Sequence, residues 1–335
     1  MSLKIRQFYT GLTIIISILS VSPVWAASFE CPSIVIVQGD MGIKTRYLGR
    51  NKDSTSSTLV PELVEEQADI RAHVNYPAKK IVDIGALYLK QRDNPKIRLC
   101  FLRHINALSD MNYLQGSGDA NIVYKSWLLS AITITALKLD QANLSFNSND
   151  TAFRQWATFR AQEIAGYYRK EGCTNNHCYW GGVATAAVGR YTSNTSLFDF
   201  SRWTLKHARA SIDKQGFLPA ELRRGKRALH YTVFATAALI SQVALLGEHY
   251  HSNSVWLETL ASQACKSVAA LNSKDDFKNL GKQDVTGTAP YLFLLKAYRP
   301  QQCGNSTKLL PGQPKAFFLG WDLGYINSLA THSSN

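Results

Sequence analysis

Apolar residues along most of this chain recur at intervals of three and four positions. The pattern begins near Leu59 and continues in one segment after another. This spacing places apolar side chains on one face of an α-helix, so it predicts a largely helical protein. The predicted helices cover about 120–139, 151–169, 180–190, 198–212, 228–246, 254–271 and 289–298.

Short polar segments separate the predicted helices. They cover 115–119, 147–150, 192–195 and 304–306, and are rich in Gly, Ser, Asn, Asp and Thr, as turns between helices are. One stretch, Ser-Ile-Val-Ile-Val at 33–37, is rich in β-formers, and we expect it to be extended rather than paired. The pattern therefore predicts one all-α domain that follows a short extended N-terminal arm.

The first residues have the pattern of a secretory signal peptide. Lys4 and Arg6 precede an apolar run from Leu12 to Val21, and Val24-Trp25-Ala26 offers a cleavage site. We therefore expect a signal peptide at 1–26 and a single domain at 27–335. The apolar run is about ten residues long, too short for a bilayer, and we expect no later span and no stable membrane insertion.

The charge of the chain favours an anionic partner. The formal net charge is +13, and removal of Lys4 and Arg6 with the signal peptide lowers it to +11. Such an excess suits nucleic acid, a membrane surface or an acidic glycan. Export argues against nucleic acid, so we expect an anionic polysaccharide, bound in the periplasm or outside the cell.

The chain has six cysteines, all after the predicted signal peptide. An even number in an oxidising compartment favours disulfides. Six cysteines allow 15 pairings; we favour Cys31 with Cys100, Cys173 with Cys178, and Cys265 with Cys303. A zinc site using Cys173, His177 and Cys178 is the alternative, but a Cys-x4-Cys loop in an exported protein more often forms a disulfide. We therefore expect no metal and no cofactor.

Two segments carry candidate chemistry. Residues 173–180 read Cys-Thr-Asn-Asn-His-Cys-Tyr-Trp, and residues 217–231 contain a dense cationic run that ends in Tyr231. Elimination from a sugar acid requires removal of the C5 proton beside a carboxylate, whose charge preorganised donors must neutralise. Asn176, His177 and Arg227 are suitable donors, and a histidine or a phenol can transfer the proton.

These segments resemble the alginate lyases, which cleave poly-mannuronate. In that family an Asn-Asn-His-x-Tyr-Trp motif supplies the asparagine and histidine, and the arginine of an Arg-Ala-Leu segment supplies the guanidinium. The resemblance implies these roles for Asn176, His177 and Arg227. It also implies an (α/α) toroid, an incomplete barrel of helical hairpins around a central cleft.

The resemblance extends over most of the mature chain. Residues 213–219 with Glu221-Leu222 are similar to the family's approach to the arginine, and Arg46-Tyr47-x-Gly49 is similar to an N-terminal Lys-Tyr-x-Gly that contacts substrate. Lys125-x-Trp127 and Pro290-Tyr291 also stand in family-like contexts. The substrate-binding residues expected on this basis are Arg46, Tyr47, Lys125, Tyr179, Trp180, Arg224 and Tyr291.

One position departs from the family pattern. The family's catalytic tyrosine follows the arginine by seven residues, and that count leads from Arg227 to Phe234, which cannot transfer a proton. Tyr231 lies one helical turn earlier. Three alternatives stay open: Tyr231 or Tyr179 takes the acid/base role, His177 acts as base with another acid, or the cleft only binds glycan. We expect His230 to point away from Tyr231.

Plainer interpretations stand beside these roles. Asn175 and Asn176 could cap a helix, the cationic run could be a solvated face, and Trp127 and Trp180 could be core residues. The leading hypothesis is a monomeric periplasmic lyase that acts on a uronate-containing glycan, with Tyr231 moving the proton. The alternatives are a non-catalytic glycan-binding accessory protein and a helical-toroid glycoside hydrolase.

Overall fold

The structure is a computed structural model in which two compact units, Met1–Glu30 and Cys31–Asn335, are distinguished. The described residues are 29–36, 38–43, 61–92, 94–141, 149–247, 255–270, 277, 280, 282–303 and 315–331. The predicted signal peptide, residues 1–26, lies outside them, so it stays a prediction. Every described helix belongs to the second unit.

Helices make up nearly all of the regular structure in the described residues, which confirms the all-α prediction. They are α1 (Pro61–Lys90), α2 (Pro95–Asp110), α3 (Asp119–Gln141), α4 (Thr151–Glu171), α5 (Asn176–Thr192), α6 (Ser196–Ser211), α7 (Pro219–Leu222), α8 (Ala228–Leu246), α9 (Val255–Ala269), α10 (Ala289–Tyr298), α11 (Pro300–Cys303) and α13 (Gly324–Thr331). One 3-10 turn, η1 (Gly225–Arg227), leads into α8, and another, η5 (Phe317–Leu319), lies between two short strands before α13.

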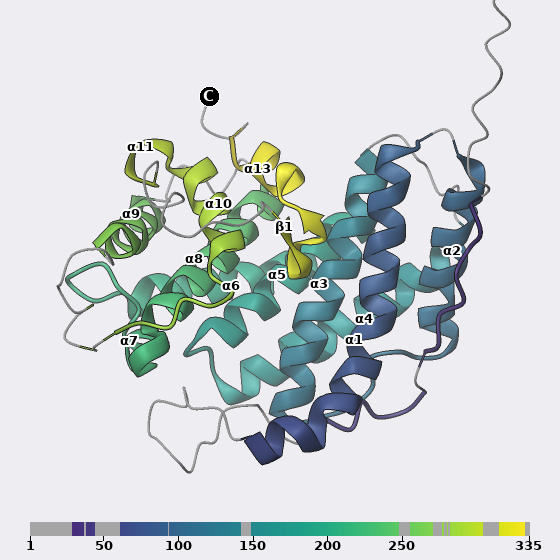
Figure 1. Ribbon diagram of the computed structural model, residues 1–335, viewed down its shortest axis with the longest axis horizontal. Helices are drawn as coiled ribbons and strands as arrows, with labels where there is room; N and C mark the ends of the chain where they lie inside the picture. Colours follow the sequence, from purple (N-terminus) through teal and green to yellow (C-terminus); the bar gives the residue numbers. More distant parts are fainter. Residues whose placement is uncertain are drawn as a thin grey trace, which may run out of the picture. The chain divides into compact units, whose positions relative to one another are not determined.

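The central helix of the fold is α5, which packs against α3, α4, α6 and α8 (Figure 1). Two consecutive glycines allow the close approach. A β-carbon at Gly182 would lie 2.3 Å from the Gln242 side-chain oxygen and 2.5 Å from the Thr204 hydroxyl. Gln242 in turn donates a hydrogen bond to the Tyr179 carbonyl, at 2.8 Å, and so ties α8 to α5.

Two of the predicted helices, α3 and α8, are strongly apolar. Within the described residues, Asp119–Gln141 and Gly225–Leu246 each have the length and composition of a membrane-spanning segment. In each, 94% of the apolar window is buried inside the protein. Burial of this extent is what a core helix of a helical domain requires, because its neighbours cover it on all sides.

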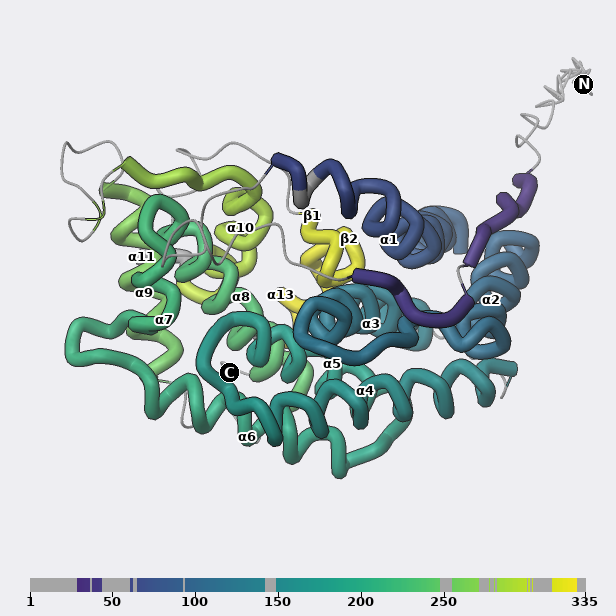
Figure 2. The backbone as a smooth tube through the Cα atoms, turned by 90° about the horizontal axis from the view of Figure 1, so that it is seen from below, coloured from purple at the N-terminus to yellow at the C-terminus, as the bar shows by residue number. Residues whose placement is uncertain are grey.

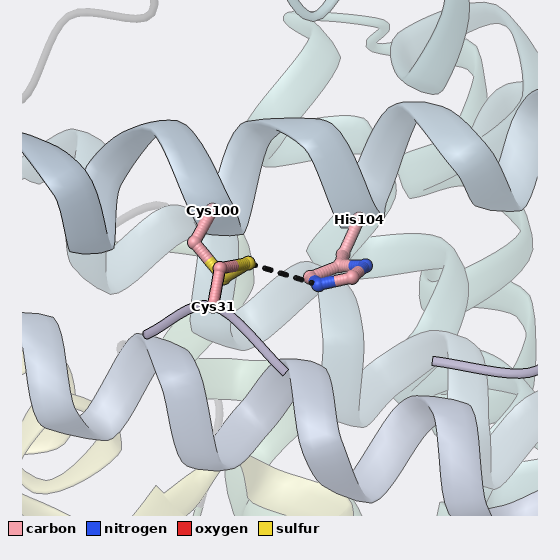
Figure 3. A group of neighbouring side chains, drawn as sticks. All are labelled: Cys31, Cys100 and His104. Atoms are coloured by element: carbon pink, nitrogen blue, oxygen red, sulfur yellow. Dashed lines mark hydrogen bonds between the residues drawn. A yellow bond between two sulfur atoms is a disulfide. The ribbon is translucent and has the colours of Figure 1, made fainter. Parts of the chain in front are cut away.

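Three disulfides form in the pairing that we favoured: Cys31–Cys100, Cys173–Cys178 and Cys265–Cys303. The first ties the N-terminal arm to α2, where His104 Nε2 lies 3.3 Å from Cys31 Sγ (Figure 3). The second uses both sulfurs of the alternative zinc site, so those thiolates are not free to bind metal. Farther along the arm, Asp40 and Gln115 form an isolated β-bridge.

A small hairpin near the C-terminus was not predicted. Strands β1 (Lys315–Ala316) and β2 (Trp321–Asp322) pair antiparallel on either side of η5, and the hairpin lies beside α1 and α3 (Figure 2). Lys138 of α3 holds it in place, because its buried ammonium donates to the carbonyls of Leu319 and Gly320 at 3.1 and 2.6 Å. Burial lowers the pKa of Lys138 to about 8.

Candidate active site

The first turn of α5 holds two predicted site residues in fixed positions. Asn175 is the N-cap, and its side chain accepts a hydrogen bond from the His177 backbone N–H at 3.0 Å. The Cys173–Cys178 disulfide joins the preceding loop to the same turn. The capping role considered for both asparagines therefore belongs to Asn175, and the Asn176 side chain is left for other contacts.

The partner of Asn176 is Glu221 of α7, a residue with no exposed surface. The backbone N–H of Asn176 donates to Glu221 Oε1 at 2.7 Å, and Asn176 Nδ2 donates to Oε2 at 2.9 Å. These two bonds fix the plane of the Asn176 amide. Burial raises the pKa of Glu221, whereas nearby Arg224 and the two Asn176 donors oppose that shift.

Two guanidinium groups lie against the ring of Tyr231. The central guanidinium carbon of Arg224 is 4.0 Å from the ring centroid, and that of Arg227 is 5.3 Å away. Such contacts are favourable because the face of an aromatic ring is electronegative. The cationic run predicted from the sequence therefore forms, around one phenol, a concentrated positive site that is suited to a carboxylate.

The loop before α10 supports this cationic group. Arg227 Nε lies 3.6 Å from Asp284 Oδ2, and the exposed fractions of the two side chains are 20% and 41%. His230 Nδ1 is 3.0 Å from the Thr288 hydroxyl. Burial, with the charges of Arg227 and Arg224, lowers the pKa of His230 to about 3, so its imidazole is neutral at neutral pH.

Phe234, at the position of the family tyrosine, lies at the centre of an aromatic cluster. Its ring centroid is 4.8 Å from that of Trp180 and 4.9 Å from that of Tyr291. Trp127 and Phe318 complete the cluster at 6.3 and 6.4 Å. Phe234 therefore has a packing role here, and it has only 5% of its surface exposed.

His177 lies beside this cluster and beside a small hollow. Its ring meets Trp127 edge-on, with centroids 6.2 Å apart. His177 also lines a hollow of about 270 Å³, together with Asn175, Cys178 and residues of α4 and the loop after it. The histidine is thus within reach of solvent despite an exposed fraction of 6%.

Several predicted substrate contacts are not supported by the positions of the side chains. Lys125 is fully buried and donates to Glu163 at 2.9 Å, so its charge is used internally. Tyr179 and Trp180 have no exposed surface, and neither has the candidate donor Asn176, so a sugar reaches any of them only where neighbouring side chains move. Lys125, Tyr179 and Trp180 belong to the core because α3 and α5 pack closely there.

The remaining predicted contacts divide in two. Arg224 and Tyr291 do lie beside the candidate site, Arg224 against Tyr231 and Tyr291 against Phe234. Burial raises the pKa of Tyr291, so its hydroxyl stays protonated. Arg46 and Tyr47 fall outside the described residues.

The expectation that His230 points away from Tyr231 was wrong. Their ring centroids are 5.0 Å apart. Neighbouring positions on a helix diverge by about 100°, but both residues belong to the first turn of α8, where long side chains can lean back over the preceding residues. His230 also stacks on Phe234, with centroids 5.8 Å apart, so it connects the phenol to the aromatic cluster.

Buried polar atoms that lack a hydrogen-bond partner among the described residues occur in this region. Five of them are Trp127 Nε1, Asn176 Oδ1, the Tyr179 hydroxyl, Trp180 Nε1 and Arg224 Nε. A buried polar group without a partner is costly, so native proteins usually satisfy it with water or a ligand. Asn176 and Arg224 thus retain hydrogen-bonding capacity beside Tyr231 and His177.

Sequence reasoning did not identify three members of the site in these roles: Glu221 as the partner of Asn176, His230 beside Tyr231, and Phe318 against Trp127. Glu221 is 45 positions from Asn176, and neither periodicity nor spacing joins them. The family-like segment around Glu221-Leu222 was the available signal, and it gave no partner for the Glu221 carboxylate.

Comparison with known proteins agrees with this geometry. Residues 91–270 match the family model described as alginate lyase. The alginate lyase of Pseudomonas syringae pv. tomato is 33% identical over 276 residues, which cover 77% of this chain and 71% of that protein. A polysaccharide lyase of Stenotrophomonas maltophilia is 28% identical over 252 residues, covering 73% and 71%.

Solved structures agree at the level of the fold. Alginate lyase A1-III from Sphingomonas species A1 superposes with a TM-score of 0.67 at 16% identity, covering 88% of this chain and 85% of that one. A variant of that enzyme complexed with a tetrasaccharide gives a TM-score of 0.70 at 17% identity, with the same coverage. This confirms the predicted (α/α) toroid. The match to the family model and the 33% identity to the Pseudomonas syringae enzyme show that the chain belongs to the alginate lyase family.

Proposed function

We propose that this protein is a polysaccharide lyase that cleaves a uronate-containing glycan, such as alginate, by β-elimination. One observation carries the proposal. Asn176 is hydrogen-bonded to Glu221, the Arg224 backbone N–H donates to the Glu221 carbonyl at 3.1 Å, and the guanidinium groups of Arg224 and Arg227 lie against Tyr231. Donors for a carboxylate and a phenol for proton transfer therefore lie on the connected starts of α5 and α8.

Neutralisation of the substrate carboxylate is the first requirement. The C5 proton of a uronate is weakly acidic, and it can be removed only when the charge that develops on the carboxylate is stabilised. We assign this role to Arg227, the remaining N–H of Asn176 and His177. Loss of one preorganised donor of this kind typically costs about 10²- to 10³-fold in rate. Arg224 adds positive charge beside the same ring.

The proton transfers are assigned to Tyr231 and His177. One base removes the C5 proton, the C4–O bond breaks, a C4–C5 double bond forms, and the departing oxygen takes up a proton. The reaction is redox-neutral and needs no cofactor, because the electron pairs move within the sugar. Tyr231 is preferred over Tyr179, since two guanidinium groups lie against the Tyr231 ring, whereas burial raises the pKa of Tyr179.

The product gives the direct test. The mature protein is mixed with poly-mannuronate, poly-guluronate and other uronate polymers, and the ultraviolet absorbance of the new double bond is followed. We expect a rise with at least one polymer. New reducing ends without this absorbance would instead indicate a hydrolase. Binding with a steep salt dependence and no product would indicate an accessory glycan-binding protein, the function that Phe234 at the family's tyrosine position favours.

The setting of the reaction is part of the proposal. We infer that the chain acts in the periplasm as a monomer, after cleavage near Ala26, because residues 1–26 have the signal-peptide pattern. Three disulfides in the structure suit an oxidising compartment. Fractionation of cells and light scattering of the mature protein would test these two points separately.

A further inference from the structure

A second and larger hollow lies away from the candidate active site. Its volume is about 890 Å³, within the range of small-molecule binding sites. It opens between the C-terminal parts of α1 and α3 and the β1–β2 hairpin, which Figure 2 shows side by side. The charged and aromatic residues that line it are Asp83, Lys90, Arg92, Lys138, Lys315, Trp321 and Asp322.

Trp321 is held in an unusual conformation at the edge of this hollow. Its backbone φ is +62°, in the left-handed region that non-glycine residues rarely adopt. The indole Nε1 donates to Asp83 Oδ1 at 2.7 Å, and the ring lies against Phe317 with centroids 5.5 Å apart. Such strain persists only where surrounding contacts maintain it, and it is frequent at binding sites.

The acidic and the basic side chains around the hollow differ in whether they have partners. Both acidic groups have partners: Asp83 accepts from Trp321, and Asp322 accepts from the Gly324 backbone N–H at 2.8 Å. Lys90, Arg92 and Lys315 are exposed and form no ion pair within the described residues. Arg92 Nε donates only to the Leu89 carbonyl, at 3.4 Å. The hollow therefore presents an aromatic ring and cations whose charges are not neutralised by a described carboxylate, which together suit an anionic sugar.

The hairpin connects this hollow to the candidate active site. Phe318 stacks on Trp127 with centroids 5.0 Å apart, and Trp127 contacts His177. From Trp127 to Lys138, α3 advances by eleven residues, about 16 Å at the rise of an α-helix. A ligand that reached both places would have to be an extended chain.

We propose that this hollow is a remote subsite that binds a further stretch of the same acidic polysaccharide. Lys90, Arg92 and Lys315 bind uronate carboxylates there, and the face of Trp321 supports a sugar ring. This inference rests on the proposed function, since it takes the substrate of that site. In this proposal the hollow strengthens the binding of long polymers and takes no part in bond cleavage.

The test compares long and short substrates. The variant K90A/K315A removes two exposed charges, and K206A/R209A removes two exposed charges from α6, away from the hollow. We expect K90A/K315A to raise KM for the polymer by about tenfold, consistent with the loss of two charge contacts. Its kcat, and its kcat/KM on a tetrasaccharide, should match the wild type. K206A/R209A should behave as the wild type on both substrates.

Trp321 provides a second variant, with melting temperature measured to detect misfolding. W321A should raise KM for the polymer, whereas W321F, which keeps a ring but loses the donor to Asp83, should have an intermediate effect. Equal KM values for K90A/K315A and K206A/R209A on the polymer would overturn the inference. So would equal losses on polymer and tetrasaccharide.

The experiments distinguish an error in the subsite proposal from an error in the proposed lyase activity. If the wild type forms no unsaturated product, binding of the polymer is measured by calorimetry at several salt concentrations. Weaker binding by K90A/K315A than by K206A/R209A would then support the subsite in a non-catalytic protein. Equal binding by the two variants would overturn it.

Discussion

The two helix starts that meet at the candidate active site are built differently. The start of α5 is closed by an N-cap, a disulfide and the buried Glu221. The start of α8 follows a 3-10 turn, and its N-cap residue Arg227 makes no capping bond; Gln283 Oε1 instead accepts from the Leu229 N–H at 3.0 Å. Arg227 is held by a partly exposed ion pair with Asp284. One half of the site is rigid, whereas the other depends on weaker surface contacts.

Asn176 should show the largest effect, because it lies on the rigid side. N176A removes a donor that no neighbour can replace, and we expect kcat to fall by about 10³-fold. N175A removes the cap instead and should cost about 1 kcal/mol of stability, with a much smaller loss of rate. Steady-state kinetics and urea unfolding of both variants check this. Equal losses of kcat would contradict the separate roles of the two asparagines.

Tyr231 tests the α8 side of the site. We expect Y231F to lower kcat by about 10²-fold or more, since proton transfer by a positioned side chain contributes about 10²- to 10⁴-fold. F234Y restores the family tyrosine at its usual position, and it should have little effect alone.

In the double variant Y231F/F234Y, the new phenol should recover part of the lost rate. Initial rates on the polymer that the wild type cleaves best are the measurement. A Y231F variant with the wild-type rate would move the role to His177. No recovery in the double variant would mean that the cluster around position 234 does not admit the substrate.

A substitution of Glu221 tests the α5 side of the site, because it weakens the hydrogen bonds that hold Asn176. E221Q replaces one acceptor oxygen with a donor that faces an Asn176 N–H. We expect kcat to fall by about tenfold, as for one disturbed hydrogen bond to a charged group, with KM nearly unchanged. E221D, which keeps the charge, should recover part of the rate. A rise in KM without a fall in kcat would argue against a positioning role.

The same residue predicts a dependence of stability on pH. Burial raises the pKa of Glu221 in the folded state, so the folded protein holds this proton to higher pH than the unfolded chain does. Its contribution to the free energy of unfolding is therefore greatest at low pH and declines as pH rises above 4.5 through the folded pKa. Urea unfolding of E221Q across that range should show a flatter profile than the wild type.

His230 should give the smallest effect, and only in acid. Its pKa is about 3 in the folded protein against an ordinary 6.5. As pH falls from 6.5 to 3, the unfolded chain gains a proton that the folded protein excludes, so the free energy of unfolding decreases. H230F keeps a ring against Phe234 and should weaken this decrease. Parallel stability profiles for H230F and the wild type would show that His230 titrates equally in both states.

Much of the fold could be predicted because the determining interactions are local in sequence. The period of apolar residues located α3, α4, α6, α8, α9 and α10 to within a few residues. It set the start of α5 four residues late, since Asn175 begins the helix by capping and apolar spacing cannot show this. The hairpin at 315–322 was missed because strands of two residues have no alternation.

The site was less predictable, because it depends on contacts between distant segments. The motifs located Asn176, His177 and Arg227, but nothing in the sequence pairs Glu221 with Asn176. Lys125 has the right charge for substrate, yet Glu163, 38 positions away, uses it in the core. Burial decided these cases, and burial follows from packing that apolar periodicity describes only in outline.

The three disulfides differ in how strongly they restrict the conformations of the unfolded chain. Cys31–Cys100 closes a separation of 69 residues, Cys265–Cys303 one of 38 and Cys173–Cys178 one of 5. Chain-entropy arguments assign about 4 kcal/mol to each of the two long loops and only about 2 kcal/mol to the short one. The Cys173–Cys178 bond, next to His177, therefore contributes least to thermal stability. A reductant that opened it alone would leave a folded protein whose turnover had slowed.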